Sequence, residues 1–365
     1  MIQHPSHDSL NSLRERVARF KADNPKLRIR NVADALGVSE VELVALNCGD
    51  SVTSVTRLRS DPESLRQLMA EMRTLGSVMA LSRNDSVVHE KTGVYGKLAG
   101  GSDVGLFLGE IDLRIFFKRW AFAYHVAEGE RRSLQFFDQA GTAVHKVYAN
   151  ADTDIQRLDQ LVTRYRVEEQ SAGQYIDPEL AAQADQRVIK PTQVDTDVDL
   201  DDFRADWDQL KDVHDFSGLL KKHNVERKQA FRLAGEERAK PLPVEVLEQA
   251  LEKAAQQKLP IMLFVGNTGI VQIHTGPVNK LVRMGPWYNV LDPGFNLHAN
   301  TETFSEAWLV RRPTEDGVVS SLEFFDQQGY QVLQLFGARK PGQKELTEWQ
   351  ALLETLERSG EAESI

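Results

Sequence analysis

His214 is a side chain of this sequence that a flat ligand could approach. It lies in the segment 206–227, where apolar residues recur three or four positions apart, and this spacing predicts an amphipathic helix. One turn beyond His214 are Ser217 and Gly218, which leave space for a flat ligand beside the imidazole. The same pattern allows a second interpretation, in which His214 is a hydrogen-bonded core histidine without a ligand.

Other patterns that carry chemistry are missing from the sequence. Cys48 is the single cysteine, which excludes an internal disulfide and a cysteine-cluster metal site. The chain has no HExxH spacing for zinc, no glycine-rich phosphate-binding loop and no GxSxG nucleophile elbow. Conventional hydrolase, kinase and dehydrogenase activities are therefore not supported.

Length and charge narrow the class of protein. With 365 residues, of which 41% are hydrophobic and 27% charged, the chain can build two globular domains. The formal net charge of -10 argues against general affinity for nucleic acid. The segment 31–46 resembles a helix-turn-helix, but it carries Glu40 and Glu42 where a DNA-binding helix needs cations. We therefore expect no nucleic-acid partner.

The sequence also indicates where the protein is found. It contains no run of about eighteen apolar residues, so we expect a protein that is not embedded in a membrane. Its first residues lack the basic segment and apolar core of a secretory signal. The cytoplasm is the expected location.

The chain contains an internal repeat. The run Ser133–Gly141 matches Ser321–Gly329, with residue numbers that differ by 188. Asn84 matches Asn267 with a difference of 183, and Arg30 matches Arg227 with a difference of 197. Such a long period predicts two tandem copies of one α+β domain, each an antiparallel sheet with flanking helices. We place the copies at residues 1–167 and 206–365, joined by an acidic linker at 168–205.

The two copies differ at residues that could hold a ligand. His214 corresponds to Val17, so the side chain at this position is predicted to face inward in both copies. Arg312 is matched with Tyr124, Arg339 with Ala151, and His298 with Arg114, although random divergence would also give such differences. Imidazole is a common axial ligand of haem iron, and arginine forks suit the two haem propionates. The combination therefore favours haem as the ligand.

Four runs of residues resemble a known family. They are the run 212–231 around His214, the N-terminal run 24–38, and the C-terminal runs 286–298 and 336–339. They resemble the bacterial cytoplasmic haem-binding proteins of haem-uptake systems, called hemin-degrading factors or hemin transport proteins. The resemblance spans nearly the whole chain and includes the duplicated architecture.

The resemblance implies roles for individual residues. His214 matches the axial haem ligand, and Arg114 matches an arginine that reaches the other haem face. The remaining implied haem-lining positions are Arg227, Phe264, Arg312, Gln334 and Arg339. A surface pair with Asp112 remains an alternative role for Arg114, and a pair with Glu226 remains one for Arg227. Phe336 stands where some members have a tyrosine, so one hydroxyl contact is lost.

The resemblance also implies a function. The protein is expected to hold haem through one axial histidine and to deliver it for degradation, as a haem chaperone. The implied partners are a haem oxygenase and the inner-membrane haem transporter. The alternative is an enzyme that itself degrades haem oxidatively and releases iron. The sequence does not decide between the two.

Overall fold

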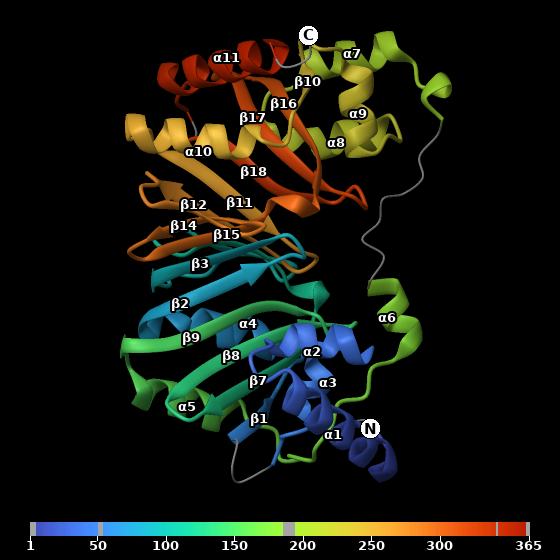
Figure 1. Ribbon diagram of the computed structural model, residues 1–365, viewed down its shortest axis with the longest axis vertical. Coiled ribbons are helices and arrows are strands. Elements are labelled where there is room, and N and C mark those ends of the chain that lie inside the picture. The colour runs from blue at the N-terminus through green and yellow to red at the C-terminus, as the bar shows by residue number, and fades with distance from the viewer. Residues whose placement is uncertain (1–4, 50–53, 185–193, 341, 363–365) are drawn as a thin grey trace. The chain divides into compact units, whose positions relative to one another are not determined.

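The structure is a computed structural model, and it describes residues 5–49, 54–184, 194–340 and 342–362 (Figure 1). Its strands form two nine-stranded sheets, and the chain divides into two compact units. The first unit contains Met1–Ser82, Glu90–Arg187 and Asn267–Gln272, and the second contains the rest. Within the described ranges, no helix is both long enough and apolar enough to cross a membrane.

The first unit is built around five antiparallel strands in the order β1-β7-β8-β9-β2. Alternate side chains of these strands face a core that also holds Leu65 of α4 and Leu158 of α5. Helices α2 and α3 pack against other clusters of buried residues. The elements up to residue 184, of which β3 belongs to the first unit only from Glu90 on, are α1 (His7–Asp23), α2 (Ile29–Leu36), α3 (Glu40–Ala45), β1 (Ser54–Leu58), α4 (Pro62–Glu71), β2 (Gly76–Arg83), β3 (Val87–Val94), β4 (Ala99–Gly100), β5 (Val104–Phe107), β6 (Asp112–Phe116), β7 (Trp120–Glu128), β8 (Arg131–Asp138), β9 (Ala143–Thr153), α5 (Ile155–Tyr165) and α6 (Pro178–Ala184).

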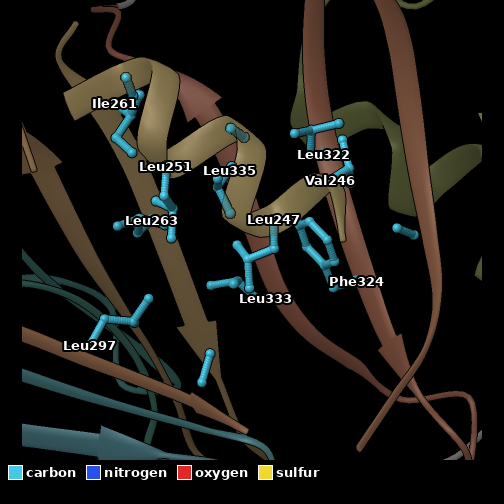
Figure 2. Close-up of a cluster of buried hydrophobic side chains, with 14 of the residues drawn as sticks. Val246, Leu247, Leu251, Ile261, Leu263, Leu297, Leu322, Phe324, Leu333 and Leu335 are labelled. Atoms are coloured by element: carbon cyan, nitrogen blue, oxygen red, sulfur yellow. The ribbon is translucent and has the colours of Figure 1, made fainter. Parts of the chain in front are cut away.

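The second unit repeats this plan with five antiparallel strands in the order β10-β16-β17-β18-β11. Helices α10 and α11 cover one face, where Leu247 and Leu251 pack among Leu263, Phe324 and Leu333 (Figure 2). Helices α7, α8 and α9 lie on the other face. The elements are α7 (Leu200–Asp208), α8 (Phe216–Lys222), α9 (Arg227–Ala234), β10 (Ala239–Leu242), α10 (Val246–Gln257), β11 (Ile261–Gly266), β12 (Ile270–Gly276), β13 (Leu281–Met284), β14 (Trp287–Asp292), β15 (Phe295–Asn300), β16 (Phe304–Thr314), β17 (Gly317–Asp326), β18 (Gln331–Gly337) and α11 (Thr347–Ala362).

The repeated asparagines Asn84 and Asn267 close equivalent turns, which confirms the predicted duplication at the level of single contacts. Asn84 Nδ2 donates to Val332 O at 2.8 Å, and Asn267 Nδ2 donates to Val144 O at 2.9 Å. The two acceptors again differ by 188 in number. In each turn the asparagine Oδ1 accepts backbone N–H groups two and three residues further on.

The strand register corrects one predicted match between the copies. Tyr124 pairs with Gln135 in the first unit, and Trp308 pairs with Glu323 in the second. Because Gln135 corresponds to Glu323, the counterpart of Tyr124 is Trp308, and the predicted match of Tyr124 with Arg312 is wrong. The β16–β17 hairpin extends two residue pairs further than β7–β8, and this insertion produced the error.

The predicted linker at 168–205 contains folded structure. It includes α6 and the first turns of α7. Before α6, Gln174 Oε1 accepts the Tyr124 hydroxyl at 2.7 Å, and Gln170 Nε2 donates to Arg57 O at 3.0 Å. These amide side chains satisfy buried groups of the first unit, whereas the acidic residues on which the prediction rested, Asp195, Asp197, Asp199, Asp201 and Asp202, are exposed.

Candidate functional site

His214 lies on a turn, and the prediction of one continuous helix through 206–227 is wrong. Helix α7 ends at Asp208, a short 3-10 turn spans Val213–Asp215, and α8 begins at Phe216. The turn is capped by Asp212, whose carboxylate accepts the backbone N–H of His214 at 2.8 Å. This side-chain cap competes with helical hydrogen bonding and separates the two helices.

The His214 side chain points outward, in contrast to the predicted inward orientation. Its exposed fraction is 88%, whereas Val17 of the first copy is half-buried. The reason is the break in the helix: in the first copy the equivalent residues belong to the unbroken helix α1. The interpretation of His214 as a buried core histidine is therefore also wrong.

The surroundings of the imidazole leave one ring nitrogen for a ligand. His214 Nδ1 is hydrogen-bonded to the carboxylate of Asp212, which places the proton on Nδ1. That N–H also lowers the pKa of Asp212, after the larger effect of the His214 backbone N–H. Nε2 makes no hydrogen bond to another of the described residues. A side-chain Cβ added at Gly218 would meet no atom within 4 Å, so there is space beside α8 at this position, and its use by a ligand of His214 stays a prediction.

The turn that carries His214 is anchored on the β16–β17 hairpin. Glu315 N donates to Lys211 O at 3.0 Å, and Trp207 Nε1 donates to Arg311 O at 3.0 Å. Beneath the turn, the ring of Phe216 is buried and lies 4.9 Å from that of Trp207. An exposed imidazole is thus held beside the end of the β16–β17 hairpin.

Arg339 lies near this turn. Its Nη2 donates to Asp316 Oδ2 at 2.9 Å, at the tip of the same hairpin. The Arg339 charge also contributes to lowering the pKa of Asp212, which places the guanidinium within electrostatic range of the His214 turn. The structure therefore brings Arg339 and His214 to the same end of the second unit.

Phe264 and Gln334 are neighbours on the sheet face that α8 and α9 partly cover. Gln334 pairs with Phe264 on one side and with Glu323 on the other, so the three side chains form one row across β11, β18 and β17. Phe264 contacts Phe336 edge-on, with ring centroids 5.2 Å apart. Phe264, Gln334 and Phe336 are half-buried, which leaves part of this face open to a ligand.

Arg227 and Arg312 converge on Glu323, a carboxylate that is fully buried. Arg227 Nε donates to Glu323 Oε2 at 2.8 Å and Arg227 Nη2 to Oε1 at 3.1 Å, so the pairing with Glu226 is not formed. Arg312 also donates to Glu323 and lies over the Phe216 ring, 4.4 Å from its centroid. Burial opposes ionisation of Glu323, but the two guanidinium groups outweigh it and lower the pKa to about 2. We call these three residues the Glu323 cluster.

Arg114 belongs to the first unit. It lies on β6, and its Nη1 donates to the carboxylate of Asp112 and to Leu113 O at 3.2 Å. Burial raises the pKa of Asp112, although the charge of Arg114 opposes the change. The alternative surface pair is thus formed, and the haem contact of Arg114 stays a prediction.

Two other histidines of the second unit have partners within the protein. His223 is buried and its Nε2 is hydrogen-bonded to Asp206 Oδ2 at 2.6 Å. His298 Nδ1 is hydrogen-bonded to Asn289 Oδ1 at 2.7 Å. With Asp202, the Asp206–His223 pair has ligand atoms within 4.8 Å of one another, but the Lys222 ammonium already binds Asp206. These pairs have structural roles.

Sequence reasoning missed Glu323 and Asp212. Glu323 of the second copy is equivalent to Gln135 of the first copy, so a carboxylate replaces an amide at a position that is buried in both copies. That difference in charge was a usable signal, since a buried carboxylate requires cations. Asp212 stands two residues before His214 in a pattern typical of a capping side chain.

Comparisons with known proteins agree with the duplicated architecture. The family model described as "Haemin-degrading HemS.ChuX domain" matches twice, at residues 37–165 and 224–356. The hemin transport protein HemS of Yersinia enterocolitica is 38% identical over 344 residues, which cover 93% of this chain and 95% of HemS.

Two solved structures are similar to nearly the whole chain. The haem-binding protein holo-PhuS of Pseudomonas aeruginosa is 41% identical, with a TM-score of 0.88 over 95% of this chain and 99% of PhuS. The heme degrading enzyme ChuS of Escherichia coli O157:H7 is 35% identical, with a TM-score of 0.83 over 94% of this chain and 98% of ChuS.

Proposed function

Because the chain belongs to the haemin-degrading HemS.ChuX family, we propose that it binds haem through His214 and delivers it intact for degradation. The observation that carries the proposal is the exposed imidazole whose Nδ1 is held by Asp212 and whose Nε2 makes no hydrogen bond to another described residue. A neutral imidazole that is oriented by a carboxylate is a good ligand for haem iron. The protein acts in the cytoplasm, between a haem transporter of the inner membrane and a haem oxygenase.

The second unit supplies the rest of the proposed site. Phe264, Gln334 and Phe336 provide a half-buried face for the porphyrin, and burial of apolar surface contributes roughly 25 cal/mol per Å². Arg339 and Arg227 serve the propionates, because guanidinium groups match carboxylates. Arg312 is buried against the Phe216 ring and contributes indirectly, by its pairing with Glu323.

A second function is favoured by the likeness to ChuS, which is a heme degrading enzyme. In this alternative, iron held by His214 reacts with oxygen, and the porphyrin ring is opened. The two functions are separated by incubating the haem complex with ascorbate while catalase removes peroxide. Stoichiometric CO and a tetrapyrrole product would establish the enzyme. Intact haem that moves to a haem oxygenase on mixing would establish the chaperone.

The D212N variant is expected to bind hemin roughly ten- to hundredfold more weakly than wild type. An amide oxygen accepts the Nδ1–H hydrogen bond more weakly than a carboxylate does, so the imidazole is less firmly oriented and is a weaker ligand. Hemin titration followed at the Soret band measures the affinity. D208N, at the exposed end of α7 and paired with Arg238 outside the proposed site, is the matched control for charge. An unchanged affinity of D212N would contradict the proposed role of Asp212.

The G218L variant is expected to weaken hemin binding roughly tenfold or more, because it fills the space one turn beyond His214. The G218A variant adds only one methyl group, which meets no atom within 4 Å, so it is expected to bind hemin normally. Alanine also favours the helix over glycine by up to about 1 kcal/mol, so α8 remains folded. Equal affinities of the two variants would show that hemin does not use this space.

A further inference from the structure

Glu323 binds one edge of the Arg227 guanidinium, and no side chain among the described residues is hydrogen-bonded to the other edge. The bonds come from Nε and Nη2, which form the side of the arginine fork. The end of the fork, formed by Nη1 and the second N–H of Nη2, is not bonded to Glu323 and faces away from it. A second carboxylate can therefore bind Arg227 at its end while Glu323 holds its side.

Aromatic rings fix the plane of the guanidinium. The Arg227 Cζ atom lies 5.0 Å from the centroid of Phe216 and 5.7 Å from that of Phe231. Arg227 is the first residue of α9, where a capping box of Glu226 and Gln229 starts the helix. The backbone, the rings and Glu323 together leave Arg227 little rotational freedom, so little entropy is lost when a ligand binds to it.

The charges of the Glu323 cluster do not cancel. Two guanidinium groups and one carboxylate give a net charge of +1. The Arg312 side chain is 2% exposed and that of Arg227 is 27% exposed, so the excess charge reaches a ligand through Arg227. Ser321 and Gln331 add neutral donors to Glu323 and leave this charge unchanged.

We infer that Glu323 is a positioning residue, which holds Arg227 so that the end of its fork receives a carboxylate of the ligand. The inference rests on the proposed haem site, where the carboxylate is a propionate. It assigns to Glu323 a specific consequence: haem with free propionates is preferred over haem whose propionates are esterified. A purely structural Glu323 would stabilise the fold and give no such preference.

The test compares hemin with hemin dimethyl ester in the full-length wild type and the E323Q variant. Glutamine keeps the shape, but its NH₂ group meets an arginine N–H where the carboxylate accepted one. E323Q is expected to bind hemin roughly tenfold more weakly and to bind the dimethyl ester as wild type does. R227K keeps the charge without the two-edged fork and is expected to give the same selective loss. If E323Q does not fold, the comparison of the two compounds is made with R227K instead.

The outcomes are distinguishable. An equal loss for hemin and its dimethyl ester, or no loss for either, overturns the positioning role of Glu323. Equal affinity of the wild type for the two compounds overturns recognition of the propionates while the haem site stands. A wild type that binds neither compound overturns the proposed function itself.

Discussion

The E323A variant is expected to lose about 3–5 kcal/mol of unfolding free energy, because it leaves two arginines without their buried partner. The Arg312 side chain is 2% exposed and cannot recover water as a partner without disrupting the sheet face. Glu323 also accepts hydrogen bonds from Ser321 and Gln331, and both groups lose their acceptor. Urea unfolding of wild type and variant at pH 7 measures the difference.

This difference is expected to shrink in acid. The pKa of Glu323 is lowered from its ordinary 4.5 to about 2. As the pH falls, the Glu323 carboxylate therefore becomes protonated at a lower pH in the folded state than in the unfolded state. The stability from Glu323 is therefore fully present above about pH 4.5 and is lost as the pH falls towards 2. The other titrating groups contribute equally to the pH dependence of the unfolding free energy of E323A and wild type, so their contributions cancel in the difference. A difference that stays constant from pH 7 to pH 3 would contradict the ion-paired state of Glu323.

A double variant separates charge from packing. Replacing Glu323 by leucine and Arg312 by methionine removes the buried pair, and the half-exposed Arg227 can turn to water. Such replacements of whole buried pairs are often neutral or stabilising. The double variant is expected to recover most of the stability that E323A loses. If it is as unstable as E323A, the loss comes from altered packing and not from unpaired charge.

The H214A variant is expected to bind hemin roughly a hundredfold more weakly, which corresponds to about 2.7 kcal/mol. The loss reflects the iron–nitrogen bond, since the exposed ring contributes little to packing. The Soret band of any residual complex is expected to shift, because the iron loses its histidine ligand. Titration of hemin followed by absorbance measures both effects.

His223 and His298 provide matched controls for this result. Each is hydrogen-bonded within the second unit, to Asp206 and to Asn289 respectively. H223A and H298A are therefore expected to keep the wild-type Soret band wherever the protein is folded. If H223A loses the wild-type spectrum and H214A keeps it, the ligand has been assigned to the wrong histidine.

The fold was predictable because the sequence repeats itself. Two copies of one pattern, each with alternating strands and flanking helices, can form one architecture twice, and the Asn84 and Asn267 turns bear this out in detail. The matching of Arg312 to Tyr124 failed because an insertion in a hairpin changes the offset without leaving a gap in the apolar pattern. Strand pairing fixes this register, and spacing along one strand does not.

The candidate site was only partly predictable. Apolar spacing around His214 suggested a single helix, but the Asp212 cap breaks it and turns the imidazole outward. Helical periodicity cannot reveal such a break, because a short polar cap occupies few positions. Arg227 lies about one hundred positions before Glu323, and Arg312 lies on the strand beside that of Glu323. Both pairings could be found only from the three-dimensional structure.

Chemical rescue tests most directly whether His214 is the haem ligand. The H214G variant removes the side chain and leaves room for free imidazole beside the haem iron. We predict that its hemin complex lacks the wild-type Soret band and that added imidazole restores the band in a saturable manner, whereas H223G needs no imidazole. An H214G complex that shows the wild-type spectrum without imidazole would contradict the account.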